Sequence, residues 1–209
     1  MLDIDVDALK ENFNCNGFIV LRDYLSLTEL NELRDRALPL IERLAESGQT
    51  AGQYSNLLKS LHRHDPWFQS QLDNGRHVPL VQKLLGVEVV GCSVAWFDRP
   101  VGEATGVPPH VDVQRGEGNI NEGITIWLAL DLVNRSNGCL HYLRGSHKEI
   151  HPNQIFITDI ETDSNDAVQV EVNPGDAVIH NALTVHWSGG NKSDMPRRAV
   201  SYFYRNKRL

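Results

Sequence analysis

His110 and Asp112 stand two positions apart in the stretch PPHVD, and both side chains are of types that bind metal ions. Residues two apart in a β-strand point to the same face, so the imidazole and the carboxylate would lie side by side. A further histidine would complete a 2-His-1-carboxylate site, which holds Fe(II) and leaves coordination positions open. The alternative is a hydrogen-bonded pair without a metal. The candidate third ligands are His141, His147, His151, His180 and His186.

The stretch HWSGGNKSDMPRR favours His186 as the third ligand. His186 and Ser188 would share one face of a strand, and a turn at 189–191 would begin a hairpin that returns Arg197 to the same edge. A guanidinium beside a hydroxyl is a good receptor for a carboxylate. The pattern therefore predicts an anion site next to the metal.

Other polar residues near these motifs leave several roles open. His180 would lie roughly 20 Å from His186 along an unbroken strand, which excludes both from one metal site and makes His180 a core or pocket residue. Thr125 shares a face with Trp127, so that one or both would reach the pocket. His141 and Arg144 would either fix a turn or contact an anionic substrate.

The elements that must position these residues change character near Val87. Residues 1–86 are predicted to be mostly helical, with a capping box at Ser26–Glu29 starting a long helix and Gly48 ending it. The remaining expected elements in this half are a helix over 7–12 that ends at Asn16-Gly17, a β-rich run over 18–25, and helices over 54–73 and 77–85.

Residues 87–205 form short β-branched and aromatic runs separated by Gly, Pro, Asn and Asp. Such strands without intervening helices predict a mainly β fold, a jelly roll of the kind found in cupins, with packing helices supplied by the N-terminal half. A chain of 209 residues with 41% hydrophobic content fits a single domain over 1–209.

Composition excludes several other classes of protein. A formal net charge of −7 gives no basic surface for nucleic acid. No apolar stretch approaches the roughly 18 residues that cross a bilayer, and the acidic start MLDIDVDALKEN is unlike a signal peptide. We therefore expect a soluble, cytoplasmic protein with no membrane partner. Its three scattered cysteines favour reduced thiols.

From about Phe13 to Tyr204 the sequence resembles the phytanoyl-CoA hydroxylase family of Fe(II)/2-oxoglutarate oxygenases. The segments that carry the resemblance, in order, are NGFIVLRDYLSLTEL, PPHVD, IWLALDLVNRSNGCLHYLRGSHK and NPGDAVIHNALTVHWSGGNKSDMPRRAVSYFY. The most specific of these are NGCL to GSHK, the Pro-Gly-Asp turn, and His186-x-Ser188 followed by Arg197.

The resemblance implies a double-stranded β-helix in which His110, Asp112 and His186 hold iron. It also implies that Arg197, helped by Ser188, binds the distal carboxylate of 2-oxoglutarate. Arg99 stands where relatives often carry a basic residue, which makes it a further candidate for binding cosubstrate or substrate, as Thr125 is. Relatives commonly have glutamine where this chain has Val111.

The reaction that the resemblance implies consumes 2-oxoglutarate and O2, releases succinate and CO2, and hydroxylates an unactivated C–H bond. Asp112 favours hydroxylation over halogenation, because halogenating relatives carry a small residue there. The polar stretch over 114–124 would suit a substrate loop for a small polar metabolite. The alternatives are a cupin-like metal-dependent isomerase or hydrolase without 2-oxoglutarate, and a non-catalytic jelly-roll binding module. Neither the substrate's identity nor the oligomeric state follows from the sequence.

Overall fold

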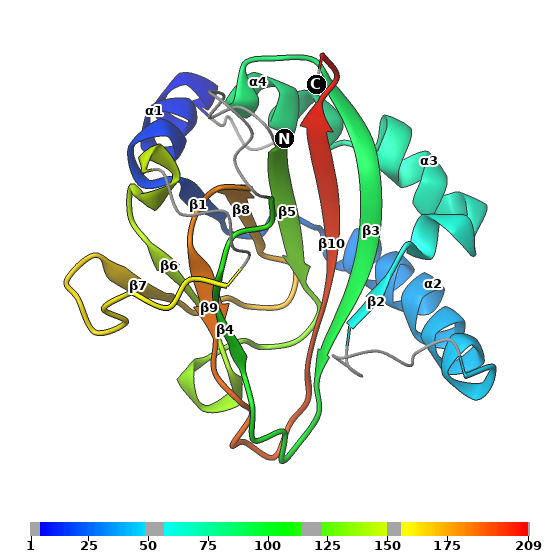
Figure 1. The fold of residues 1–209 in the computed structure, drawn as a ribbon. Helices are drawn as coiled ribbons and strands as arrows, with labels where there is room; N and C mark the ends of the chain where they lie inside the picture. The colour runs from blue at the N-terminus through cyan, green and yellow to red at the C-terminus, as the bar shows by residue number, and fades with distance from the viewer. Residues whose placement is uncertain (1–4, 49–56, 114–122, 150–155, 209) are drawn as a thin grey trace.

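The computed structural model describes residues 5–48, 57–113, 123–149 and 156–208. Among these residues, two antiparallel sheets form the centre of the molecule (Figure 1). The large sheet has the strand order β1-β8-β5-β10-β3-β2 and the small sheet the order β4-β9-β6-β7. The mainly β, jelly-roll prediction is confirmed. The strands are β1 Phe18–Leu21, β2 Leu57–Lys59, β3 Val89–Arg99, β4 Val107–His110, β5 Gly123–Ala129, β6 Leu140–Leu143, β7 Ala167–Val170, β8 Ala177–Asn181, β9 His186–Ser188 and β10 Arg197–Asn206.

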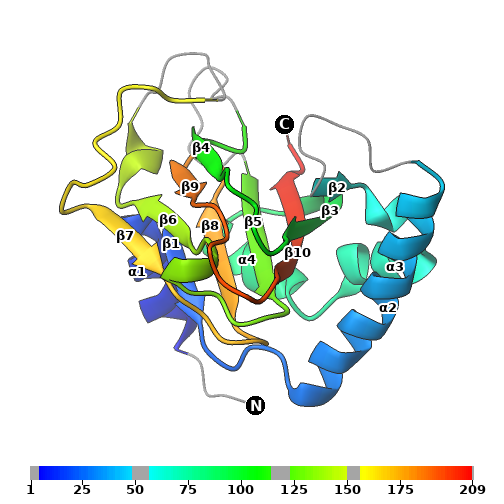
Figure 2. The same ribbon diagram turned by 90° about the horizontal axis from the view of Figure 1, so that it is seen from below.

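Four α-helices in the described part of the chain cover the outer face of the large sheet (Figure 2): α1 Val6–Asn16, α2 Leu27–Glu46, α3 Pro66–Asn74 and α4 Val78–Leu85. The short 3-10 helices are η1 Leu61–Arg63, which joins the same core through Leu61, and η2 Arg135–Asn137 and η3 Ser146–Lys148 elsewhere in the fold. The expected capping box starts α2: Ser26 accepts from the Glu29 N–H, and Glu29 accepts from the Ser26 N–H. Helix α2 buries one stripe of side chains at helical spacing, namely Leu30, Leu33, Ala37, Leu40 and Leu44. Among the described residues, no helix is both long and apolar enough to cross a membrane.

The continuous helix expected over 54–73 is wrong where the structure describes it. Strand β2 occupies Leu57–Lys59, and Ser60 adopts a left-handed conformation with φ of 69°. Helix α3 begins only at Pro66, with the Asp65 carboxylate accepting from the Trp67 N–H. A proline disfavours helical geometry in the preceding residue, and Asp65 is extended here, so Asp65-Pro66 starts a helix instead of continuing one. Residues 54–56 lie outside the described part of the chain.

Strand β10 divides its side chains between two environments. Val200, Tyr202 and Tyr204 join the core beneath the helices. Ser201 and Phe203 point to the opposite face and line a cavity between the two sheets. This alternation follows from the two-residue period of a strand. One face of the large sheet therefore holds the fold together, while the other is available to a site.

A buried histidine beneath the large sheet should make stability depend on pH. His77 is 3% exposed and its ring lies 4.4 Å from that of Tyr202. Burial, assisted by Arg76, lowers the pKa of His77 from 6.5 to about 4. Between these values the unfolded chain binds a proton that the folded chain does not, so stability is complete above pH 6.5 and falls as the pH drops toward 4. Over this pH range the free energy of unfolding falls by about 3 kcal/mol.

Urea unfolding of the protein and of His77→Phe across this pH range measures that contribution. The substitution keeps an aromatic ring against Tyr202 and removes the titrating nitrogen. We expect the wild-type free energy of unfolding to fall more steeply below pH 6.5 than that of the variant. Parallel profiles for the two proteins would contradict the assignment to His77.

Candidate active site

The structure brings the three predicted metal ligands together at the junction of β4 and β9. His110 and His186 are direct partners in this antiparallel pair, and Asp112 follows two residues after His110. One ligand atom from each of the three residues lies within 4.8 Å of the others. The Asp112 N–H donates to the carbonyl of Ala182 at 2.8 Å, which fixes the backbone that carries the carboxylate.

Both imidazoles are held with the same nitrogen free for a ligand bond. Nδ1 of His110 lies 2.9 Å from the Pro108 carbonyl oxygen, and Nδ1 of His186 lies 2.9 Å from the Thr184 carbonyl oxygen. A carbonyl only accepts, so Nδ1 carries the hydrogen in each ring and Nε2 keeps its lone pair. Burial is the main cause that lowers the pKa of His110 and holds that of His186 well below its usual range. Both rings are therefore neutral, which is the form that binds metals.

The carboxylate of Asp112 completes a donor set that fits Fe(II). Burial by itself raises the pKa of Asp112, but the hydrogen bond from His180 and the neighbouring imidazoles hold it well below its usual range. Its Oδ1 lies 3.7 Å from Nε2 of His186, and the side chain is 26% exposed toward the cavity. Two neutral imidazoles and one ionised carboxylate on one side of an open space match the requirements of a 2-His-1-carboxylate iron site.

His180 does not lie where an unbroken strand would place it. Strand β8 ends at Asn181, whose carbonyl accepts from the Thr184 N–H in a tight turn, and the chain then enters β9 in the other sheet. The rings of His180 and His186 consequently lie 4.5 Å apart, and the prediction of a long separation is wrong. Of the two expected roles, core or pocket residue, His180 has the second, because it lines the cavity.

Arg197 and Arg99 form a buried cationic pair that lines the same cavity as the metal ligands. They are direct partners in the β10–β3 ladder. Arg197 is 2% exposed, and its Nε has no hydrogen-bond partner among the described residues. Its guanidinium lies 5.6 Å from the ring centroid of Trp127. Burial, followed by the proximity of Arg99, lowers the pKa of Arg197 to about 9. An anion bound beside the two arginines would offset both the cost of burying Arg197 and its repulsion with Arg99.

The expected hairpin between His186 and Arg197 is wrong, although both residues do line the same cavity. Strand β9 belongs to the small sheet and β10 to the large one, so Arg197 faces the metal ligands from the opposite wall. Ser188 likewise contacts a different arginine from the one expected: its Oγ accepts from Nη2 of Arg99 at 3.4 Å. Thr125 lines the cavity and donates to Oδ2 of Asp112 at 2.6 Å.

The cavity has a volume of about 320 Å³ and takes its walls from both sheets. Several of the polar residues considered from sequence lie elsewhere. His141 stacks on Trp187 at 5.3 Å, and Nε2 of buried His147 lies 3.2 Å from the Asn14 carbonyl oxygen. Neither they nor Arg144 are among the described residues that line the cavity. His151 and residues 114–122 of the expected substrate loop lie outside the described residues. The lining residues are Leu57, Lys59, Ser93, Ala95, Phe97, Arg99, Val107, His110, Val111, Asp112, Thr125, Trp127, Leu140, Phe156, His180, His186, Trp187, Ser188, Arg197, Ser201 and Phe203.

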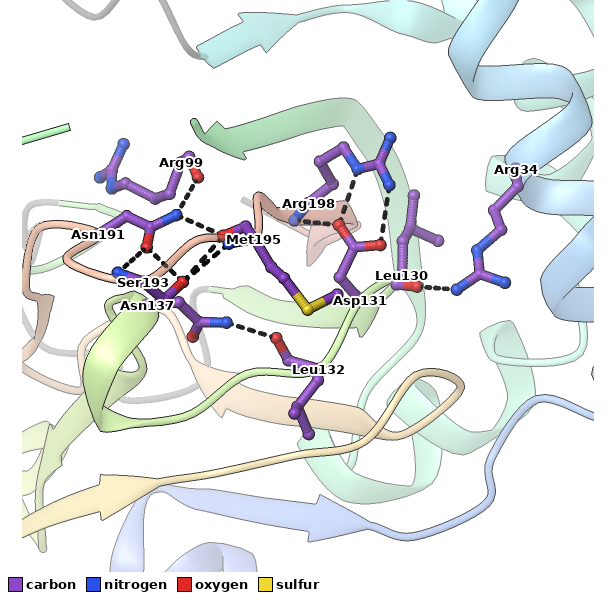
Figure 3. A network of polar contacts seen from close by, with 10 residues as sticks. All are labelled: Arg34, Arg99, Leu130, Asp131, Leu132, Asn137, Asn191, Ser193, Met195 and Arg198. Atoms are coloured by element: carbon purple, nitrogen blue, oxygen red, sulfur yellow. Dashed lines mark hydrogen bonds and ion pairs between the residues drawn. The ribbon is translucent and has the colours of Figure 1, made fainter. Parts of the chain in front are cut away.

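Asn191, which the sequence suggested only as a turn residue, ties the loop after β9 to the end of β3 (Figure 3). Its amide donates to the carbonyls of Arg99 and Met195 at 2.7 and 2.8 Å. Its Oδ1 accepts from the N–H of Ser193 at 2.9 Å. The side chain is 1% exposed, so these bonds are shielded from water. The backbone that carries Arg99 is thereby anchored beside the start of β10.

Asn191→Ala should lower the free energy of unfolding by about 2–3 kcal/mol, because it leaves buried carbonyls unsatisfied. Urea denaturation measures this loss. Ser193→Ala is the matched control: it removes a neighbouring side chain of the same loop that is only partly buried, and should cost under about 1 kcal/mol. Equal midpoints for wild type and Asn191→Ala would show that this anchor contributes nothing to stability.

Two opposed antiparallel sheets around two histidines and a carboxylate are the arrangement of iron- and 2-oxoglutarate-dependent oxygenases. The family model for phytanoyl-CoA dioxygenase (PhyH) matches residues 13–199, and the chain belongs to this family. The resemblance seen in the sequence is confirmed. A probable phytanoyl-CoA dioxygenase of Caenorhabditis elegans is 26% identical over 229 residues, which cover 93% of this chain and 73% of the relative.

Solved structures share the fold over almost the whole chain. AviO1 from Streptomyces viridochromogenes Tue57 aligns with a TM-score of 0.81 and 24% identity, covering 99% of this chain and 97% of that one. EctD from S. alaskensis, solved with 2-oxoglutarate and 5-hydroxyectoine, aligns with a TM-score of 0.80 and 21% identity, covering 95% of this chain and 75% of that one. The epimerase SnoN, solved with Fe3+, alpha ketoglutarate and nogalamycin RO, aligns with a TM-score of 0.77 and 20% identity, covering 96% of this chain and 83% of that one.

Proposed function

We propose that this dioxygenase hydroxylates an unactivated C–H bond of a small, polar metabolite and releases succinate and CO2 from 2-oxoglutarate. His110, Asp112 and His186 would hold Fe(II), and Arg197, with Arg99 and Ser188, would bind the distal carboxylate of 2-oxoglutarate. The observation that carries the proposal is the buried Arg197, whose Nε lacks a partner among the described residues, in the cavity that the metal ligands line. An isomerase or hydrolase without an acidic cosubstrate would have no use for this cation.

The residues of the chain divide the work of the reaction among them. Iron, when bound, couples the oxidative decarboxylation of 2-oxoglutarate by O2 to replacement of the substrate hydrogen by hydroxyl. The arginine pair orients the cosubstrate by charge-assisted hydrogen bonds, and burial strengthens these bonds because water is excluded. Apolar walls such as Trp187 and Phe203 exclude water from the reacting groups.

The shape and lining of the cavity support a small substrate. A volume of about 320 Å³ is at the low end for ligand pockets and must also accommodate 2-oxoglutarate. Lys59, Ser93 and Ser201 add polar groups to a largely apolar lining, which suits a metabolite with both characters. Structural neighbours carry 5-hydroxyectoine and nogalamycin RO in their crystals, and these are likewise small molecules.

Reaction outcome and substrate class are tested together by anaerobic loading with Fe(II), followed by O2 and 2-oxoglutarate with a panel of polar metabolites. We expect one class of metabolite to raise succinate formation above the substrate-free rate and to gain one oxygen atom, as mass spectrometry would record. A long-chain acyl-CoA serves as the comparison and should not raise succinate formation. A product of unchanged mass would replace hydroxylation by epimerisation, the activity named for SnoN.

A further inference from the structure

The two oxygens of the Asp112 carboxylate have different surroundings. Oδ2 accepts a hydrogen bond from Oγ1 of Thr125 at 2.6 Å and lies 2.9 Å from Nε2 of His180. Oδ1 is on the side of His186, at 3.7 Å from its Nε2. A carboxylate can bind a metal ion through one oxygen or through both. The neighbours of Oδ2 therefore bear on which oxygen a metal would take.

The tautomer of His180 follows from its two partners. An ionised carboxylate only accepts, so Nε2 of His180 carries the hydrogen and donates to Asp112. In the neutral ring Nδ1 then accepts, and Tyr142 donates its hydroxyl hydrogen to it across 3.0 Å. Both ring nitrogens are thus engaged, which explains why His180 is not a ligand although its ring lies close to that of His186.

Both donors to Oδ2 stand on rigid parts of the fold. Thr125 and His180 are direct partners in the β5–β8 ladder, and they are 6% and 3% exposed. Tyr142 comes from β6 in the other sheet, is fully buried and stacks on Phe18 at 4.5 Å. The hydrogen-bonded chain from Tyr142 through His180 to Asp112 therefore links both sheets to one ligand.

We propose that His180, acting with Thr125, is a positioning residue that commits Oδ2 of Asp112 to hydrogen bonds and presents Oδ1 alone to the metal. This inference rests on the proposed function. A second carboxylate oxygen on the iron would occupy a position that the cosubstrate and O2 require, because three protein ligands leave only three positions open. Residues that support a metal ligand in this way are typically worth 10- to 100-fold in metal affinity or activity.

Titration of the metal-free protein with Co(II) tests the proposal without turnover. Calorimetry gives the dissociation constant, and the visible absorption of bound Co(II) reports the number and arrangement of its ligands. His180→Phe removes the N–H but keeps a ring in place, whereas His180→Gln keeps an N–H near the Nε2 position. Thr125→Val and Thr125→Ser form the corresponding pair on the other donor, in case His180→Phe does not fold.

We expect His180→Phe and Thr125→Val to raise the Co(II) dissociation constant about 10-fold or more and to alter the visible spectrum. His180→Gln and Thr125→Ser should stay close to wild type. Thermal unfolding of each metal-free variant separates this effect from a general loss of stability. Unchanged affinity and spectrum in folded His180→Phe, or in Thr125→Val if that is the variant that folds, would overturn the proposal. Failure of the wild type to bind Co(II) would instead overturn the proposed function.

Discussion

Arg197→Met should raise the dissociation constant of 2-oxoglutarate by about 30- to 1000-fold and leave metal binding unchanged. The range corresponds to a loss of about 2–4 kcal/mol, as expected for removal of a buried, charge-assisted receptor of a carboxylate. Methionine keeps an unbranched apolar stem beside Trp127, the ring over which the guanidinium now lies. The substitution also relieves the repulsion with Arg99 that helps to lower the pKa of Arg197 to about 9.

Isothermal titration of the metal-loaded, oxygen-free protein with 2-oxoglutarate measures the effect. Arg197→Lys is the matched control: it retains the charge but not the planar fork, and should fall between wild type and Arg197→Met. Because the arginine is buried with an unpartnered Nε, the methionine variant should unfold at the same temperature as wild type or higher. Loss of metal together with 2-oxoglutarate would contradict the separation of the two sites across the cavity.

His186→Ala should abolish substrate-dependent succinate formation and weaken Fe(II) binding by more than about 100-fold, the upper end of what loss of a supporting residue costs. The imidazole would supply one of three ligands. Among the described residues His180 is the neighbouring imidazole outside the proposed ligand set, and it cannot replace His186 because both of its nitrogens are already hydrogen-bonded. His64→Ala is the control because His64 is exposed and does not line the cavity.

Anaerobic Fe(II) titration of the two histidine variants gives the comparison. The control should match wild type in iron content and in 2-oxoglutarate turnover. Near-stoichiometric iron in His186→Ala would mean that a different set of residues holds the metal, and the assignment of His110 and Asp112 would fall with it.

Local patterns predicted which candidate ligands the structure brings together, because the decisive spacing is short. His110 and Asp112 are held by one segment, and His186 was favoured by neighbours within the same stretch. What could not be predicted is where the chain changes sheet. The turn after Asn181 brings His180 into the site, and the crossover between β9 and β10 places Arg197 on the opposite wall. Both depend on long-range strand pairing, which periodicity does not report.

The same limit applies to residues that support the site. The strand period placed Thr125 and Trp127 on one face. The hydrogen bond from Thr125 to Asp112, however, arises between segments 13 residues apart. Asn191 has the type expected of a turn residue, and its role in anchoring β3 depends on a carbonyl 92 residues away. Helix α3 shows the opposite case: Asp65-Pro66 is a local signal for a helix start, and the incorrect prediction of one helix over 54–73 does not use it.

The most direct measurement is the visible spectrum of the protein loaded with Fe(II) and titrated with 2-oxoglutarate in the absence of oxygen. Chelation of iron by the 2-oxo acid produces a weak charge-transfer band. We predict that the band appears with wild type, saturates at one 2-oxoglutarate per iron, and requires much higher 2-oxoglutarate concentrations with Arg197→Met. A folded, fully iron-loaded wild type that shows no band would contradict the assignment of this cavity to iron and 2-oxoglutarate.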